Sequence, residues 1–169
     1  MQTSSEGQNW YFLIFVDDFT RMTLVFLLKE KSEAFEVFRR FKAMVENQSN
    51  HRIKVLRSDL RGEFTSKSFN RFCKEHGIRR QLTAAYSPQQ NGVAERKNRT
   101  IMEIAKAMLK EKGVPNIFWA EAVNTTVYIL NRSSTKAVPN QTPIEAWIGV
   151  KSNISHMKVF GSVLCKHTR

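Results

Sequence analysis

The sequence predicts an α/β or α+β domain in which a mixed β-sheet is flanked by helices. Two apolar runs of strand-forming residues, 10–18 and 22–29, are separated by a tight turn at Thr20 and Arg21. Because both runs are apolar at successive positions, they predict an antiparallel hairpin that is buried on both faces. Helical and strand-like patterns then alternate along a chain of 169 residues, which is long enough for one sizeable domain.

The remaining elements follow from apolar spacing and from capping signals. In chain order they are a helix with apolar positions from Ala34 to Val45, a strand over 53–57 that ends near Asp59, a short helix opened by Ser66 or Ser68 and closed by Gly77, a strand over 78–83, a polar loop, helices over 93–112 and 116–131, a short helix over 143–147 and a β-like segment over 158–166. We expect residues 1–113 to form a partial core and residues 114–169 a helical C-terminal extension with a short terminal β segment.

Charge is the most unusual part of the composition. Lysine and arginine number 27 against 15 acidic residues, which gives a formal net charge of +12. Such an excess favours a polyanionic partner, usually DNA or RNA, over the alternative of a generally basic soluble protein. A membrane-surface protein is disfavoured because no helix is basic on one side and aromatic on the other. No run of 18 apolar residues predicts a membrane span, and the polar N-terminus is not a signal peptide.

The two cysteines and four histidines predict neither disulfides nor a zinc site. Cys73 and Cys165 lie far apart, and no histidine stands at zinc-finger spacing from them. Cys73 falls within an amphipathic helical pattern, so we expect it to be a small core residue.

Asp59 and Glu95 are the strongest candidates for chemistry. Asp59 ends an apolar run, and Glu95 follows after 35 intervening residues, near the start of a predicted helix. Carboxylates from a strand end and a helix can converge on a divalent cation, and carboxylate oxygens suit Mg²⁺ and phosphoryl transfer. The alternative is a solvated Asp at a strand end and a Glu that the helix dipole favours near an N-terminus.

The residues around both acids resemble a known family. Residues 56–66 read LRSDLRGEFTS, and residues 77–99 read GIRRQLTAAYSPQQNGVAERKNR. Together they closely resemble the integrase catalytic core of copia-type LTR retrotransposons. The resemblance extends in order to FVDDFTR at 15–21, NTTVYILNR at 124–132, TPIEAW at 142–147 and VFGSV at 159–163, so it covers nearly the whole chain.

This resemblance implies an RNase H-like fold and DNA integration by polynucleotidyl transfer, with 3′-end processing followed by strand transfer. Asp59 and Glu95 match the second and third acids of the D,D-35-E triad and would be ligands of Mg²⁺ or Mn²⁺. Asn91, Lys97 and Arg99 would face the DNA end, and residues 86–91 would form a mobile loop over the site. The resemblance also implies that the protein acts in the nucleus, with a cytoplasmic particle stage for the intact element.

Two departures from the family pattern predict a catalytically incomplete chain. Leu60 and Arg61 replace the Asn and Gly that usually follow the second Asp, and Arg61 could strain the turn or repel metal ions. The first, central strand and its Asp are not matched, and Asp17 and Asp18 are weak substitutes because their motif matches the hairpin. Strand edges left without that neighbour invite self-association or pairing with intact integrase. The alternatives are a non-catalytic basic nucleic-acid-binding or assembly module and a non-functional relic.

Overall fold

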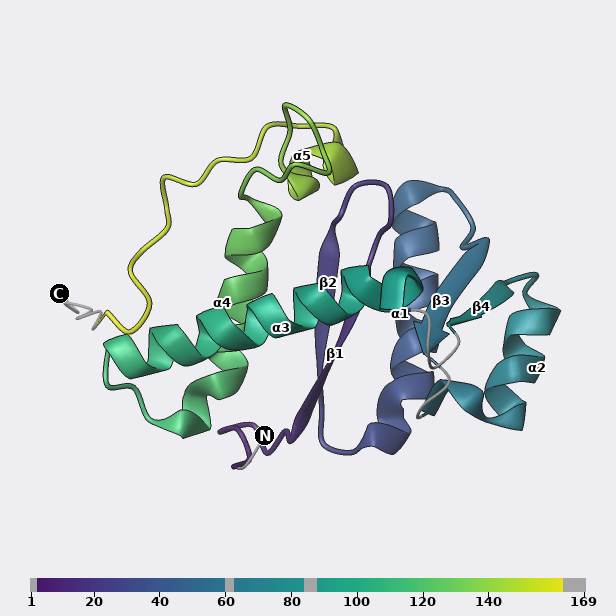
Figure 1. The fold of residues 1–169 in the computed structure, drawn as a ribbon, viewed down its shortest axis with the longest axis horizontal. Coiled ribbons are helices and arrows are strands. Elements are labelled where there is room, and N and C mark those ends of the chain that lie inside the picture. The colour runs from purple at the N-terminus through teal and green to yellow at the C-terminus, as the bar shows by residue number, and fades with distance from the viewer. Residues whose placement is uncertain (1–2, 60–62, 84–87, 163–169) are drawn as a thin grey trace, which may run out of the picture. The chain divides into compact units, whose positions relative to one another are not determined.

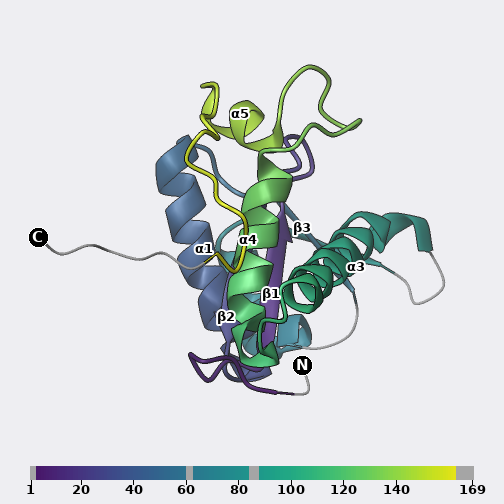
Figure 2. The same ribbon diagram turned by 90° about the vertical axis from the view of Figure 1, so that its left-hand side faces the viewer.

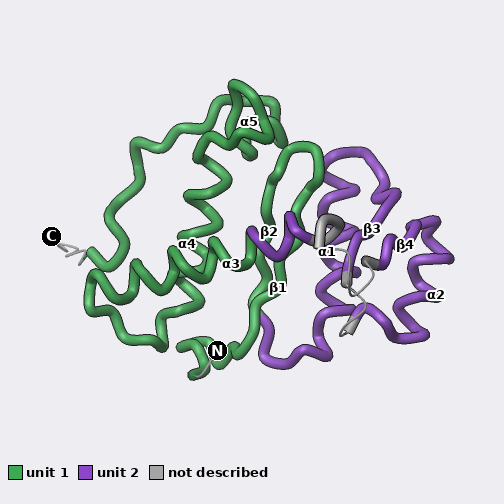
Figure 3. The backbone as a smooth tube through the Cα atoms, viewed as in Figure 1, with its two compact units in different colours: residues 1–27, 97–169 green, residues 28–96 purple. Residues whose placement is uncertain are grey.

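The computed structural model describes residues 3–59, 63–83 and 88–162; the side chains of residues 59, 63, 83 and 88–91 also lie outside the description. The chain forms two compact units (Figure 3), one made of residues 1–27 and 97–169 and the other of residues 28–96. We call them unit 1 and unit 2. This division does not test the predicted domain boundary at residue 113, which stays a prediction. The four described strands form two separate two-stranded sheets.

Strands β1 (Tyr11–Val16) and β2 (Thr23–Leu28) form the predicted hairpin. The Asp17 N–H donates to the Met22 carbonyl at 2.9 Å, and the Arg21 N–H donates to the Asp17 carbonyl at 3.0 Å. The Asp17 carboxylate accepts from both the N–H and the hydroxyl of Thr20, at 2.7 and 2.8 Å. A short connection of this kind can join only antiparallel neighbours, so the hairpin prediction is confirmed.

Arg21 takes an unusual backbone conformation in this turn. Its φ is 61°, in the left-handed region that glycine and asparagine occupy at least cost. An arginine there carries a penalty on the order of 1–2 kcal/mol. Its guanidinium makes a 2.8 Å ion pair with Asp18, whose side chain is 64% exposed. Because an exposed pair contributes at most about 1 kcal/mol, this contact does not explain why arginine occupies the position.

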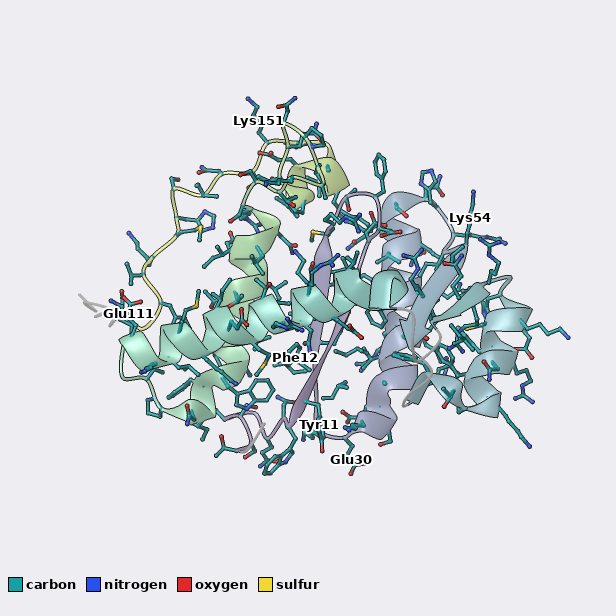
Figure 4. The ribbon with its side chains drawn as sticks, in the orientation of Figure 1. Tyr11, Phe12, Glu30, Lys54, Glu111 and Lys151 are labelled. Carbon is teal, nitrogen blue, oxygen red and sulfur yellow. The ribbon has the colours of Figure 1, made fainter. Side chains whose placement is uncertain are left out.

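The core of unit 1 lies between the hairpin and two helices, α3 (Pro88–Glu111) and α4 (Trp119–Asn131) (Figures 1 and 2). The short helix η3 (Asn116–Phe118) joins them. Ile101 and Ala105, two members of the predicted buried stripe, pack with Trp119 and Val123. Phe12, labelled in Figure 4, packs against this cluster from β1, with its ring centroid 6.4 Å from that of Trp119.

A buried amide ties the end of α4 to the start of β2. Asn131 is 3% exposed, and its side-chain oxygen accepts from the Thr23 N–H at 3.0 Å. Its side-chain nitrogen donates to the Thr23 carbonyl at 2.7 Å. Both backbone groups of Thr23 are therefore satisfied by one side chain that is far away in sequence.

Unit 2 contains a two-stranded parallel sheet. Strands β3 (Val55–Asp59) and β4 (Arg79–Thr83) pair in register from Val55 opposite Arg79 to Asp59 opposite Thr83. Helix α2 (Lys67–Glu75) provides the crossover between them and is preceded by η2 (Glu63–Thr65). Ser66 caps α2 by accepting from the Phe69 N–H at 3.1 Å, as one of the two predicted caps. Gly77, with φ 67°, follows the helix and allows the chain to reverse.

A cluster of phenylalanine rings forms the core of unit 2. Phe38, on α1 (Ala34–Ser49), and Phe69, on α2, are fully buried, with ring centroids 5.2 Å apart. The ring centroids of Phe35 and Phe64 lie 5.3 and 5.0 Å from that of Phe69, and the centroid of Phe72 lies 6.3 Å from that of Phe38. Edge-to-face contacts of this kind add to the free energy gained from burial alone.

Cys73 and Arg80 lie beside this cluster. Cys73 is 1% exposed, so its predicted core position is confirmed. The Arg80 guanidinium lies 4.8 Å from the centre of the Phe69 ring and donates to Asn70 at 2.8 Å and to Ser58 at 3.1 Å. Burial raises the pKa of the Cys73 thiol, and the positive charge of Arg80 partly opposes this rise.

Acidic side chains, and not the Ser32 hydroxyl, satisfy the backbone donors at the start of the helical segment that leads into α1. The short helix η1 (Lys31–Glu33) leads into α1, and the Glu33 carboxylate accepts from the Lys29 N–H at 2.8 Å. The Ser32 hydroxyl instead donates to the Glu30 carboxylate at 3.0 Å. An acidic side chain therefore satisfies the backbone donors at this terminus.

Two larger expectations about the fold are corrected. Helix α3 begins at Pro88 and not near residue 93, so residues 88–91 are helical and not part of a loop; residues 84–87 lie outside the description. Proline is well suited to a first helical turn because its missing N–H has no partner there. Residues 158–162 of the predicted 158–166 β segment form a turn in which the Ser162 N–H donates to the Val159 carbonyl at 3.2 Å. Gly161 has φ 79°, which is incompatible with a strand.

The short helix predicted over 143–147 is confirmed as α5 (Pro143–Ile148), which begins with a reciprocal cap. Thr142 accepts from the Glu145 N–H at 3.4 Å, and the Glu145 carboxylate accepts from the Thr142 N–H at 2.9 Å. None of the described helices combines the length and the apolar character that crossing a membrane requires.

We expect Asn131→Ala to destabilise unit 1 by about 2–4 kcal/mol, because it leaves a buried N–H and a buried carbonyl without partners. All three tryptophans, at positions 10, 119 and 147, belong to unit 1, so tryptophan fluorescence during urea unfolding measures this loss. The matched control is Asn124→Ala, an exposed asparagine on the same helix, which should change stability by less than about 0.5 kcal/mol. Equal effects of the two substitutions would contradict this role for Asn131.

We also expect the isolated 169-residue chain to self-associate or to unfold without a cooperative transition. A two-stranded sheet has an outer edge on each strand, and two-stranded sheets are marginally stable in water. Each buried backbone group left without a partner costs about 1–3 kcal/mol, against a total domain stability of about 5–15 kcal/mol. Sedimentation and thermal melting test this, and a monomer with sharp, reversible unfolding would show the expectation to be wrong.

Candidate functional site

The parallel β3–β4 ladder positions the backbone of Asp59. Asp59 is the last residue of β3 and pairs with Thr83 at the carboxyl end of the ladder. In parallel sheets the carboxyl ends of strands are where ligand-binding side chains gather. The Asp59 side chain lies outside the description, as do residues 60–62, so the predicted effects of Leu60 and Arg61 stay predictions.

Helix α3 carries the other four predicted site residues. Asn91 lies in its first turns, with a side chain outside the description, and Glu95 follows as an exposed residue about one turn further along. Arg99 is exposed as well, whereas Lys97 is half-buried. Glu95 and Arg99 thus have the solvent access that a ligand requires. Lys97 lies four residues before Ile101, which belongs to the buried stripe of the helix.

The environment of Lys97 is unfavourable for a positive charge. Burial lowers the pKa of Lys97, and the like charge of Arg21 lowers it further. Lys97 belongs to α3 and Arg21 to the hairpin turn, and both residues lie in unit 1. Because the two residues are 76 positions apart in the sequence, no local pattern predicts that Arg21 influences Lys97.

The structure assigns the predicted residues to the two units as follows. Asp59, Asn91 and Glu95 belong to unit 2, whereas Lys97 and Arg99 belong to unit 1. Within residues 3–59, 63–83 and 88–162, and among the side chains described there, no three His, Cys, Asp or Glu residues form a group that could hold a metal ion. The roles of the five residues therefore stay predictions, which rest on the family pattern and on their chemistry.

Asp17 and Asp18, the weak substitutes for a first triad acid, both have structural roles. The Asp17 carboxylate accepts two hydrogen bonds from Thr20 and so fixes the hairpin turn. Asp18 makes the ion pair with Arg21. These contacts support the simpler expectation that the two acids end a strand and form a turn.

One exposed residue in the same turn has no counterpart among the predicted site residues. Phe19 is 86% exposed, the highest value among the large exposed apolar side chains of the described chain. The sequence signal was present, because an aromatic residue stands between turn-forming residues in the motif at 15–21.

Comparisons with known proteins agree on one family. A family model described as the integrase core domain matches residues 1–88. The retrovirus-related Pol polyprotein from transposon TNT 1-94 of Nicotiana tabacum is 44% identical over 161 residues, which is 95% of this chain and 12% of that protein. The corresponding polyprotein from transposon RE2 of Arabidopsis thaliana is 38% identical over 151 residues, or 89% of this chain and 10% of that protein. The chain thus spans about a tenth of the length of these curated relatives.

Solved structures show the same fold. A chain of the simian T-cell lymphotropic virus intasome, determined in complex with PP2A regulatory subunit B56 gamma, aligns over 99% of this chain and 57% of its own length, with a TM-score of 0.67 and 14% identity. The HTLV-2 integrase catalytic core domain, determined in complex with magnesium, aligns over 78% of this chain and 80% of its own length, with a TM-score of 0.59 and 21% identity. The predicted RNase H-like α/β fold is therefore confirmed. Because the family model covers more than half of the chain and the plant polyproteins match nearly all of it, the chain belongs to the integrase core domain family, among the copia-type retrotransposon Pol polyproteins.

Proposed function

We propose that this chain is the part of a retrotransposon integrase that joins DNA ends by polynucleotidyl transfer. The observation that carries the proposal is the placement of two acids 36 positions apart within one compact unit of an integrase core: Asp59 at the carboxyl end of a parallel ladder and Glu95 exposed on α3. A strand end and a helix are rigid supports, and phosphoryl transfer depends on positioning more than on covalent chemistry.

The donor chemistry of these acids fits Mg²⁺ or Mn²⁺. Both side chains offer carboxylate oxygens, which are the preferred ligands of such hard cations. When bound, the metal ions would lower the pKa of the attacking hydroxyl and offset charge on the leaving oxygen. The ladder between Asp59 and Thr83 fixes the backbone that carries one ligand, and the second lies on the exposed side of a continuous helix.

DNA would be held chiefly through its phosphates. The net charge of +12 supplies long-range attraction, and Arg99 offers an exposed guanidinium on the same helix as Glu95. Contacts of this kind position the DNA without reading its sequence. Asn91 and Lys97 complete the proposed DNA-facing set, and the half-burial of Lys97 suits a single fixed phosphate better than a diffuse surface charge. Integration into host chromosomes would place this work in the nucleus.

We further propose that the 169-residue segment alone does not catalyse joining. The D,D-35-E pattern requires three acids, and Asp59 and Glu95 supply two. The turn contacts of Asp17 and Asp18 argue against their service as the third. In the longer polyprotein, an acidic strand from outside this segment would complete both the sheet and the acid set. A non-catalytic role in DNA binding or assembly with intact integrase is the second candidate, which the separation into two small sheets favours.

Strand transfer provides the first test. The 169-residue chain should give no joined product with a labelled DNA end in Mg²⁺ or Mn²⁺. In a longer polypeptide that includes an additional acidic strand, joining should appear, and Asp59→Asn and Glu95→Gln should each abolish it. Joining by the 169-residue chain that disappears with Asp59→Asn would refute the claim of incompleteness, whereas a longer polypeptide that binds DNA but never joins it would favour the second candidate.

Salt dependence provides the second test. The logarithm of the affinity for duplex DNA should fall linearly with the logarithm of salt concentration, largely independently of sequence. Arg99→Glu should weaken binding about equally for unrelated sequences and reduce the salt slope by about 1. Lys136→Glu, an exposed residue in unit 1 away from α3, is the control for net charge alone. An affinity that is unchanged between low and physiological salt would count against phosphate binding.

A further inference from the structure

Arg132, at the C-terminal cap of α4, places its guanidinium over the ring of Tyr128. The guanidinium carbon lies 3.5 Å from the centre of that ring, which belongs to the preceding turn of the helix. A cation held over an aromatic face is attracted to it and has a defined position. Both residues belong to the motif at 124–132, to which the proposed function gives no role.

Most of the hydrogen-bond donors of Arg132 have no acceptor within the protein. A guanidinium has five N–H donors. Its Nη1 donates to the Tyr128 carbonyl at a long 3.4 Å, and its Nε is buried without an acceptor. Arg132 is half-buried and makes no ion pair with any side chain that the structure describes. Because a desolvated charge without acceptors is costly, an anion that binds the remaining Nη donors would stabilise this arrangement.

The acids that follow α3 in the sequence do not supply that anion. Residues 112–162 contain two acids, Glu121 and Glu145. Glu121 lies in the first turn of α4, about 16 Å along the helix axis from Arg132. The Glu145 carboxylate accepts from the Thr142 N–H at 2.9 Å and from the Ser152 N–H at 3.2 Å, with a different oxygen for each. The C-terminal end of a helix favours any cation, so it does not explain a guanidinium over a tyrosine ring.

A second side chain with a free donor or acceptor meets the other end of Tyr128. The Tyr128 hydroxyl and His156 Nε2 form a hydrogen bond, and the two rings are 6.0 Å apart at 78°. His156 is exposed and lies on the segment that follows α5 and returns towards the end of α3 (Figures 1 and 2). When the hydroxyl donates to Nε2, the neutral imidazole carries its hydrogen on Nδ1, which contacts no other described residue. Tyr128 thus orients a guanidinium over its face and an imidazole at its hydroxyl.

We propose that Arg132 and His156, both oriented by Tyr128, bind a phosphate of the DNA backbone. This assignment rests on the proposed function and adds to it a second DNA contact, on α4 of unit 1 and not on α3. A guanidinium suits phosphate because its paired donors match two phosphate oxygens. Lys151, labelled in Figure 4, and Lys158 are exposed on the same segment as His156. Together with the net charge of +12, they favour a polyanion over a single carboxylate as the ligand.

The first test measures the affinity of the 169-residue chain for duplex DNA of two unrelated sequences. Arg132→Lys keeps the net charge and removes the planar pair of donors, so affinity for both sequences should fall at least about fivefold. The control is Arg39→Gln, which removes a whole charge from an exposed arginine of unit 2 that Glu36 already pairs at 2.9 Å. It should weaken binding less than about twofold, because it removes no phosphate contact.

Two further variants separate the guanidinium from the imidazole. Arg132→Gln should reduce the slope of log affinity against log salt by about 0.9, because one phosphate contact is lost. Tyr128→Phe keeps the ring beneath Arg132 and releases His156, so it should weaken binding without changing that slope. Tyr11→Phe, which removes the hydroxyl of a 38% exposed tyrosine on β1, is the matched control and should leave affinity unchanged. Circular dichroism melts establish that each variant is folded as the unaltered chain is.

The outcomes separate this proposal from the proposed function. Unchanged affinity with Arg132→Lys, or a loss no greater than that with Arg39→Gln, overturns the phosphate site. If Arg99→Glu still weakens binding in that case, the proposed function stands without it. Binding that depends on Arg132 and not on Arg99 would retain this site and count against the DNA-facing set on α3.

Two other results would also show the proposal to be wrong. If Arg132→Lys changes self-association in sedimentation and not DNA affinity, Arg132 contacts protein. If it reduces affinity for a polyglutamate peptide as much as for DNA, the site binds carboxylates generally. Should the Arg132 variants melt at a lower temperature than the unaltered chain, Tyr128→Phe decides, and unchanged DNA affinity in that variant overturns the proposal.

Discussion

Burial of small sheets by helices is the constraint on which the rest of this structure depends. A two-stranded sheet cannot exclude water from its own backbone, and among the residues that the structure describes each unit contains one such sheet. In unit 1, Ile101, Trp119 and Val123 pack against one face of the hairpin and exclude water from it. Unit 2 uses a group of interlocking phenylalanine rings from α1, α2 and η2. Of the proposed site residues, Glu95 and Arg99 lie where this packing leaves side chains exposed.

Helix α3 connects the packing to the proposed site. Its residues from Ile101 to Leu109 belong to the unit 1 core, whereas Glu95 precedes that buried stretch and belongs to unit 2. Lys97 lies at the transition, where the helix face changes from exposed to buried. This position explains why Glu95 and Arg99 remain accessible while the residue between them loses water. A change in how α3 packs would therefore change the exposure of Glu95, Lys97 and Arg99 together.

Local patterns were sufficient to predict the hairpin, the α2 cap at Ser66, the burial of Cys73 and the stripe through Ile101 and Ala105. Each depends on periodicity or on contacts between sequence neighbours. The family resemblance added the fold and the assignment of Asp59 and Glu95 to the triad pattern, because spacing alone could not distinguish them from two solvated acids.

Contacts between distant segments could not be predicted. Nothing local indicates that Asn131 satisfies Thr23 or that Arg21 lies near Lys97, because these pairs are joined only by tertiary packing. The helical start at Pro88 was missed because Pro88 and Gly92 resemble loop residues, although proline is compatible with a first turn. The turn at Val159–Ser162 was missed because its apolar residues resemble a strand, whereas Gly161 imposes a reversal.

The position of Cys73 makes the two units separately observable. A thiol reacts as its thiolate, and the buried Cys73 thiol is held in its protonated form. Alkylation at this residue, located by peptide mapping, therefore requires unit 2 to open. All tryptophans lie in unit 1, so their emission follows the other half of the chain. The wild-type sequence thus carries two native reporters, and the order in which the halves lose structure is accessible without any introduced label.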